Sequence, residues 1–208
     1  MIEGVMTGRL GFWLAHLFVL AYCGVLLGAF VVQFGVGDLP CPLCILQRQA
    51  MILVMCGPLY IIGRARRGDV TLADYTMGYG MSIVAAVVGA GVAARQILLH
   101  IVPPDPGYGS AVLGLHLYTW SFITFCVVLV FCGVSLIFGR ELVPRGVRFG
   151  WASKVVCGLF LVTVAANLVA VFFELGFHWF LPSNPTRYEA FHGLLLLGAA
   201  AMSGGAVG

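Results

Sequence analysis

Five long apolar segments constrain the fold of this chain more than any other feature of its sequence. A helix needs about 20 mostly apolar residues to cross the hydrocarbon core of a bilayer, and each segment approaches or exceeds that length. The segments cover residues 11–34, 45–62, 75–102, 117–138 and 153–181. Because lipid offers the backbone no hydrogen-bond partner, each segment must satisfy its own peptide groups as a helix. The sequence therefore predicts an all-α integral membrane protein with five transmembrane helices.

The composition predicts a single membrane domain over residues 1–208. Hydrophobic residues make up 61% of the chain and charged residues 9%, whereas a soluble domain carries roughly 25% charged residues. We expect no cleavable signal peptide, because the first apolar run is longer than an h-region and no A-x-A-like site follows it. The tail at 182–208 contains a further uncharged stretch at 190–207, which leaves three alternatives open: a sixth span, a re-entrant piece or an interfacial helix.

The basic residues predict an orientation. If the N-terminus is cytoplasmic, eight of the 11 basic residues lie on that side, namely Arg9, Arg64, Arg66, Arg67, Arg140, Arg145, Arg148 and Lys154. The opposite loops, 35–44 and 103–116, contain no Lys or Arg, as the positive-inside rule predicts. Cys41 and Cys44 then face the outside, which in a bacterium is the oxidising periplasm. The net charge of +3 follows from this topology and does not require a nucleic-acid partner.

A Cys-Pro-Leu-Cys motif at residues 41–44 lies between the first two apolar segments. Two cysteines at this spacing can form, break and pass on a disulfide. Pro40 and Pro42 disfavour helix at the residues before them, and proline suits the first helical position, so we expect the second helix to begin at Pro42. Cys41 would then lie outside the helix, exposed to a protein partner. Cys44 would lie in the first turn, where the helix dipole favours its thiolate.

Arg48 lies one turn beyond Cys44 on the same helix face. A permanent cation beneath a thiolate stabilises negative charge on the sulfur, or on a reduced acceptor beside it. The competing interpretation is a helix-end arginine that extends to the membrane surface. Its spacing from Cys44 and its place away from the other basic residues favour the functional interpretation.

The remaining cysteines and the histidines give weaker signals. Five cysteines fall in or near apolar segments, where small buried cysteines are common: Cys23, Cys56, Cys126, Cys132 and Cys157. Two histidines, His100 and His116, share the outer side with Cys41 and Cys44, and two Cys with two His would suit zinc. Nothing in their spacing brings the four together, so we expect no metal site.

Three short stretches resemble the DsbB family of membrane quinone reductases, which regenerate disulfides for periplasmic oxidases. The first is Pro-Cys-Pro-Leu-Cys-Ile-Leu-Gln-Arg at 40–48, and the second is Arg-Gln-Ile-Leu-Leu-His at 95–100. The third is Gly114-Leu115 followed by Trp120. The resemblance covers residues 11–138 and implies an antiparallel four-helix bundle, to which residues 153–181 add a fifth transmembrane helix. That helix ends with Glu174, His178 and Trp179, which we interpret as interface anchors.

The resemblance implies a catalytic role for three residues. Cys44 would meet a quinone, ubiquinone or menaquinone, Cys41 would be its disulfide partner, and Arg48 would hold a quinone oxygen. Gln96, His100 and Arg95 would be polar neighbours of the quinone. The protein partner would be a periplasmic thioredoxin-fold oxidase resembling DsbA, or another dithiol protein. The location would be the bacterial inner membrane.

The chain departs from the family at the loop 102–116, which contains no cysteine. Family members carry a second cysteine pair there, which takes electrons from the soluble oxidase. A substrate dithiol could meet Cys41 directly, a second protein could supply the relay, or the activity has changed. Two hypotheses follow: a protein-dithiol:quinone oxidoreductase, and a non-catalytic membrane subunit that retains a quinone-pocket-like bundle.

Overall fold

The computed structural model describes residues 2–68, 70–176 and 185–191 of the chain. Within these residues, five helices are long and apolar enough to cross a membrane. They are α1 (Ile2–Val31), which continues into the π-helix η1 (Val32–Val36), then α2 (Pro42–Arg64), α3 (Leu72–Leu99), α4 (Leu117–Ile137) and α6 (Trp151–Leu175). The short helix α5 (Gly139–Leu142) lies between α4 and α6. The chain is therefore an all-α, multi-pass membrane protein, as the sequence predicts.

The boundaries of the helices follow local signals in the sequence. Pro42 is the first residue of α2 and Cys41 is its N-cap, with an extended backbone, so the predicted start of this helix is confirmed. The first helix begins earlier than expected, at Ile2 and not at residue 11. The fifth long helix ends at Leu175, short of the predicted residue 181, because Gly176 takes a positive φ of 59°. His178, Trp179 and the stretch 190–207 lie mostly or wholly outside the described residues.

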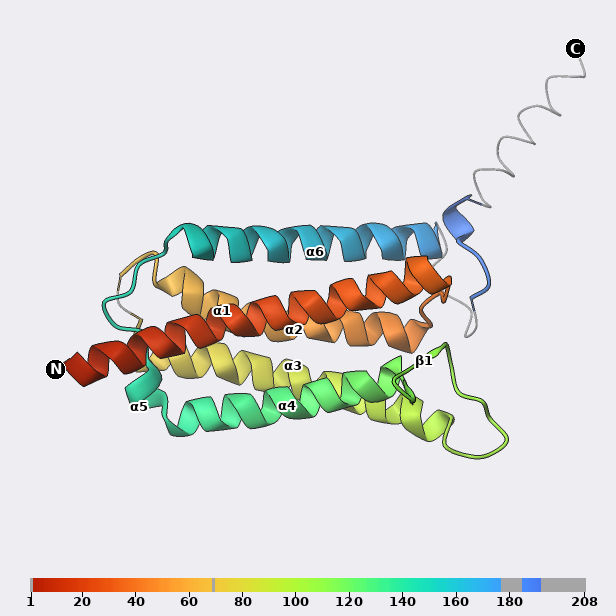
Figure 1. Cartoon of the computed structure of the whole chain (residues 1–208), viewed down its shortest axis with the longest axis horizontal. Helices are drawn as coiled ribbons and strands as arrows, with labels where there is room; N and C mark the ends of the chain where they lie inside the picture. The colour runs from red at the N-terminus through yellow and green to blue at the C-terminus, as the bar shows by residue number, and fades with distance from the viewer. Residues whose placement is uncertain (1, 69, 177–184, 192–208) are drawn as a thin grey trace, which may run out of the picture.

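Successive long helices run in opposite directions, and each of α1 to α3 packs beside the next (Figure 1). Helices α2 and α3 approach each other closely, because a Cβ atom added at Gly57 or Gly78 would collide with the facing helix. Small residues of this kind let membrane helices approach closely enough to pack well. Ser82 of α3 donates a hydrogen bond of 2.8 Å to the carbonyl of Val54 in α2. These contacts make the α2–α3 pair the tight centre of the bundle.

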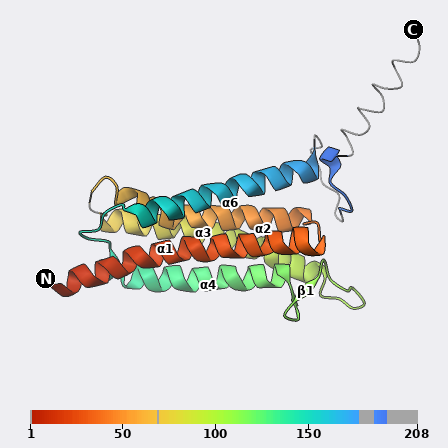
Figure 2. The same cartoon turned by 45° about the horizontal axis from the view of Figure 1, so that its top comes forward.

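The fifth long helix, α6, packs against α1 and α2 on the outside of the four-helix group (Figures 1 and 2). Near its start, Ser153 hydrogen-bonds the ring of His16 in α1 at 2.9 Å. Both side chains are buried. Helix α6 is thus fixed to the bundle at one end by a polar contact, and it carries its other end towards the cysteine loop.

Two loops meet at the end of the bundle where α2 begins. The loop between α3 and α4 contains a small hairpin, β1 (Ala111–Val112) paired with β2 (Leu115–His116), which the all-helical prediction did not include. Leu113 and Gly114 form its turn with positive φ angles of 54° and 81°, the conformation that two-residue hairpin turns require. This loop lies over the cysteine loop, whereas Arg64 lies at the other end of α2.

Candidate active site

Cys41 and Cys44 are held together by the first turn of α2. The sulfur of Cys41 accepts a hydrogen bond of 3.2 Å from the backbone N–H of Cys44. Both are free thiols. Cys41 lies outside the helix as predicted, but its expected exposure is wrong, because only 5% of its surface is accessible. The backbone N–H of Cys44, in the first turn of α2, donates to the sulfur of Cys41. The sequence predicts instead that the N-terminus of the helix stabilises the thiolate of Cys44.

The loop that carries the small hairpin covers Cys41. The hydroxyl of Tyr108 donates to the carbonyl of Leu39 at 2.6 Å. The backbone N–H of Ser110 donates to Asp38 at 2.7 Å. These two bonds join the loops directly before Cys41 to the loop between α3 and α4, and we call this pair of contacts the strap. The burial of Cys41 is therefore a product of tertiary contacts between distant segments.

The side chain of Gln96, on α3, contacts both sulfurs. Its amide nitrogen lies 3.1 Å from the sulfur of Cys41 and 3.5 Å from that of Cys44. Its oxygen accepts a hydrogen bond of 2.7 Å from Gln47. Because Gln47 occupies the oxygen, the NH₂ group is directed at the sulfurs, where it can stabilise negative charge. The sequence analysis did not identify Gln47, although a buried polar residue in an apolar span is a signal of such a role.

The surroundings of Cys41 lower the pKa of its thiol to about 7. The largest cause is the hydrogen bond from the Cys44 thiol, and the backbone N–H of Cys44 and the amide of Gln96 act in the same direction. Burial opposes them by raising the pKa. A thiol with such a pKa is about half ionised at neutral pH, and the thiolate is the form that attacks disulfides.

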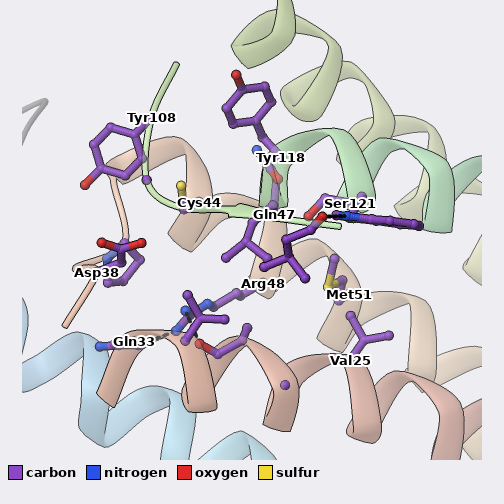
Figure 3. Close-up of a pocket in the computed structure, with 18 of the residues that line it drawn as sticks. Val25, Gln33, Asp38, Cys44, Gln47, Arg48, Met51, Tyr108, Tyr118 and Ser121 are labelled. Carbon is purple, nitrogen blue, oxygen red and sulfur yellow. Dashed lines mark hydrogen bonds between the residues drawn. The ribbon is translucent and has the colours of Figure 1, made fainter. Parts of the chain in front are cut away.

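A cavity of about 370 Å³ opens beside Cys44, between α1, α2, α4 and the two loops (Figure 3). Its lining is mostly apolar, with polar groups from Gln33, Asp38, Cys44, Gln47, Arg48, Tyr108, Tyr118, Ser121 and Thr124. We call it the Arg48 cavity. Apolar walls with a few directed polar groups are typical of sites that bind a small organic ligand.

Arg48 is 8% exposed and lines this cavity. Its guanidinium donates to the side-chain oxygen of Gln33 at 2.6 Å and to the carbonyl of Ala29 at 3.4 Å. It also lies over the ring of Phe30, 5.4 Å from the centroid. Within the described part of the chain, no carboxylate forms an ion pair with it. A permanent cation with neutral partners keeps the capacity to stabilise a negatively charged oxygen in the cavity.

The structure brings together only part of the predicted cofactor-binding set. Arg48 lines the cavity, and Gln96 lies behind the sulfurs. Arg95 is exposed and is not part of the lining. His100 pairs with Asp105 at 2.9 Å and stacks on Tyr118, also outside the lining. A cofactor-binding role for Arg95 and His100 therefore stays a prediction, and neither residue lines the cavity.

The two histidines and two cysteines at the N-terminal end of α2 do not form a cluster of metal ligands. His116 hydrogen-bonds the carbonyl of Gly109, and its ring stacks on Tyr118. In the described ranges, no group of three or more His, Cys, Asp or Glu residues is placed to hold a metal ion.

Two further polar residues near Arg48 were missed as site residues. Gln33 of η1 connects Arg48 to the hydroxyl of Tyr188, which lies 3.4 Å from the Gln33 amide. Glu174 of α6 was interpreted as an interface anchor, which is wrong, because its side chain is 0% exposed. It interacts electrostatically with Arg48 and Cys44. The available signal was its position inside a long apolar helix, where an acidic side chain is costly.

Fold and site together define a multi-pass membrane protein with a pair of thiols beside an apolar cavity that Arg48 lines. The family model for disulfide bond formation protein DsbB matches residues 11–110. Disulfide bond formation protein B of Azoarcus sp. is 35% identical over 120 residues, which cover 56% of this chain and 68% of that protein. The chain belongs to the DsbB family.

Other relatives match over shorter stretches. Disulfide bond formation protein B of Chromobacterium violaceum is 38% identical over 101 residues, 48% of this chain and 56% of that protein. Disulfide bond formation protein B 1 of Pseudomonas fluorescens strain Pf0-1 is 37% identical over 76 residues, 36% of this chain and 42% of that protein. The chain thus spans about half the length of most curated relatives it matches. No solved structure gives a significant match.

The match to the family model includes both sulfurs, Arg48 and Gln96, but it ends in the loop before α4. Helix α6 and its Glu174 therefore lie beyond the matched region.

Proposed function

We propose that this protein oxidises protein dithiols to disulfides and passes two electrons through Cys41 and Cys44 to a membrane quinone. One observation carries the proposal: Cys44 and Arg48 line the same apolar cavity. A redox-active sulfur and a fixed positive charge are thereby placed at the same ligand site. Membership of the DsbB family supports the same reaction class.

The lining of the Arg48 cavity fits a quinone head group. Apolar residues such as Val25 and Met51 offer flat contact to a ring, and Arg48 is the donor that would hold a ring oxygen. The volume of about 370 Å³ lies in the range of small-molecule sites. When bound, a quinone supplies a two-electron, two-proton acceptor.

The two sulfurs have different tasks in this proposal. Cys41, with its lowered pKa, is the sulfur that exchanges with the disulfide or dithiol of a partner protein. Cys44, which lines the cavity, is the sulfur that faces the electron acceptor. When the pair is oxidised, two S–H bonds break, one S–S bond forms, and two electrons and two protons leave the sulfurs. Gln96 contacts both sulfurs and orients them throughout.

The partner would be a periplasmic thioredoxin-fold oxidase resembling DsbA, or another dithiol protein. The loop between α3 and α4 contains no cysteine, so the partner must reach Cys41 directly or through a second protein. Because Cys41 is buried under the strap, this contact requires the strap to open. The charge asymmetry of the loops supports a location in the bacterial inner membrane with this end at the periplasmic side.

The test is anaerobic mixing of the reduced protein with ubiquinone or menaquinone while quinol formation is followed by absorbance. We expect one quinol per protein and a matching loss of free thiol at Cys41 and Cys44. A Cys132→Ser variant is the matched control, because Cys132 is buried in α4 away from the cavity. If neither quinone is reduced and the two thiols stay free, the protein is the alternative, a non-catalytic membrane subunit with a retained bundle.

A further inference from the structure

Helix α6 brings a carboxylate to the neighbourhood of Arg48. Its last turns lie at the same end of the bundle as the cysteine loop, next to α1 and α2 (Figures 1 and 2). Glu174, on this last turn, is fully buried. It interacts electrostatically with Arg48 and with Cys44. The fifth helix therefore adds an acidic group to a site whose other parts come from α1 to α4.

Glu174 has no hydrogen-bond partner for either carboxylate oxygen within the described part of the chain. Arg48 gives its own hydrogen bonds to Gln33 and Ala29. The two groups thus attract one another without forming an ion pair. A buried carboxylate that lacks hydrogen bonds is costly in its ionised form. Its charge state consequently responds to changes in the charge around it.

We propose that Glu174 is a titratable counter-charge for Arg48. While Glu174 is ionised, it offsets the positive charge of Arg48. When Glu174 is protonated, the full charge of Arg48 acts on Cys44 and on the cavity. This role rests on the proposed function for its purpose, but it can be measured on the thiol pair without a quinone.

The charge balance of the site explains how such a group would work. In the resting dithiol, Arg48 carries +1, Glu174 carries −1 and Cys44 is a neutral thiol. When the Cys44 S–H bond breaks and its proton is released, Glu174 takes up one proton and an O–H bond forms on its carboxylate. Arg48 then faces a thiolate, and the net charge of the buried site has not changed. Because one negative charge is lost at Glu174 as another forms at Cys44, the site avoids the cost of an uncompensated buried charge.

The other groups that act on this pair are few. Cys44 is on α2, as is Arg48, and Tyr108 contributes from the loop between α3 and α4. Tyr188, beyond α6, acts on Arg48, and α1 and η1 contribute the uncharged Gln33. Tyrosine hydroxyls are neutral near pH 7. Among the described residues, Glu174 shares this capacity with two groups of the cysteine loop: the Cys41 thiolate, which acts on Arg48, and Asp38, which lines the same cavity. Because Glu174→Gln leaves Cys41 and Asp38 in place, the comparison of the two proteins isolates the contribution of Glu174.

The experiment compares wild type with Glu174→Gln in the full-length protein after quinone removal. The ratio of dithiol to disulfide at Cys41–Cys44 is measured in glutathione buffers from pH 5 to pH 8. The glutamine keeps the volume of Glu174 and imitates its protonated form at every pH. Stabilising a thiolate favours the reduced form of a pair. We expect an equilibrium constant shifted about tenfold towards the dithiol at pH 7, which corresponds to one unit in a thiol pKa.

The pH dependence is the decisive part of this comparison. The difference between wild type and Glu174→Gln should vanish at low pH, where the wild-type glutamate is itself protonated, and should grow as the pH rises. Asn167→Leu is the matched control, because Asn167 is also a buried polar residue of α6. If Glu174→Gln does not fold, Glu174→Asp keeps the charge on a shorter side chain and should keep the wild-type pH dependence.

Two results would overturn the proposal. One is an equal ratio in wild type and Glu174→Gln at every pH. The other is a shift of the same size in Asn167→Leu. Failure of the proposed function looks different: wild type then makes no quinol, whereas the glutathione equilibrium still reports on Glu174.

Discussion

The two ends of α2 each carry an arginine that is at least partly buried, and the two arginines have different hydrogen-bond partners. Arg64 at the C-terminal end forms an ion pair of 2.9 Å with Asp74. Asp74 also accepts hydrogen bonds from Tyr60 and from the backbone and hydroxyl of Thr71, as part of the capping box of α3. Arg48 near the N-terminal end bonds an amide oxygen and a carbonyl instead.

The difference separates a structural arginine from one that is left available for a ligand. A guanidinium that is paired with a carboxylate has little capacity left for a second anion. A guanidinium with neutral partners in an apolar cavity retains that capacity, at a cost in stability. The comparison therefore predicts that changes near Arg48 alter the reaction, whereas changes near Arg64 alter the stability of the bundle.

The largest effect is expected for Cys44→Ser. A hydroxyl at this position cannot form a disulfide with Cys41, so quinol formation should fall on the order of 10³-fold or more. Stopped-flow absorbance of quinol measures the loss, and Cys126→Ser should retain nearly full activity. Full activity in Cys44→Ser would rule out electron transfer through this pair.

A smaller loss is expected when the charge beside Cys44 is removed. Arg48→Ala should lower quinol formation on the order of 10²-fold, the effect of losing one group that stabilises developing charge. Arg48→Lys should lose less, mainly as a raised apparent KM for quinone, because lysine keeps the charge but not the planar donors. Arg64→Ala is the matched control at the other end of the helix. Equal losses of activity in the two alanine variants would break the comparison.

The reactivity of Cys41 should depend on pH as its lowered pKa requires. With a pKa of about 7, the thiolate fraction and the rate of alkylation should rise about tenfold between pH 6 and pH 8 and then level off. Mass spectrometry of the alkylated 41–44 peptide, with fragmentation to assign the label to Cys41, measures the profile in wild type and again in a Cys44→Ala background. Because the Cys44 thiol is the main cause of the low pKa, this background should shift the midpoint upwards. An unchanged midpoint would contradict that assignment.

The smallest effect concerns stability at the Arg64 end. Asp74→Ala removes half of the capping box and the ion pair, so it should cost about 1 kcal/mol of unfolding free energy. Thermal unfolding in detergent should show a midpoint a few degrees lower, while quinol formation stays at the wild-type rate below that temperature. A loss of activity without a loss of stability would assign a role to Asp74 in the reaction.

The parts of the site that depend on local sequence could be predicted. The start of α2 at Pro42 follows from the steric restrictions of two prolines, and the place of Cys44 in the first turn follows from that start. The helical, membrane-spanning fold follows from five apolar runs. The resemblance to the DsbB family placed Gln96 near the quinone site, and the structure places it against both sulfurs.

The parts that depend on contacts between distant segments could not be predicted. Cys41 is buried because Tyr108 and Ser110, about 70 positions later in the chain, bond the residues beside it. Glu174 reaches the site only because α6 packs on α1 and α2, and periodicity alone does not say which face of a long apolar helix meets the bundle. A small change in packing would have left either residue in solvent or in lipid.

The strap over Cys41 also determines which reductants and oxidants have access to the thiol pair. A tripeptide such as glutathione has too little surface to displace two hydrogen bonds and the hairpin that follows them, whereas a folded protein can replace those bonds with its own. The strap thus slows thiol–disulfide exchange between the cysteine pair and small thiols in solution. Glutathione should reduce the oxidised pair more slowly than a protein dithiol of equal reduction potential. Tyr108→Phe removes the 2.6 Å hydrogen bond to Leu39, so it should make the difference between these two reduction rates smaller. Equal rates for both reductants in wild type would show that the covered sulfur is open to all thiols alike.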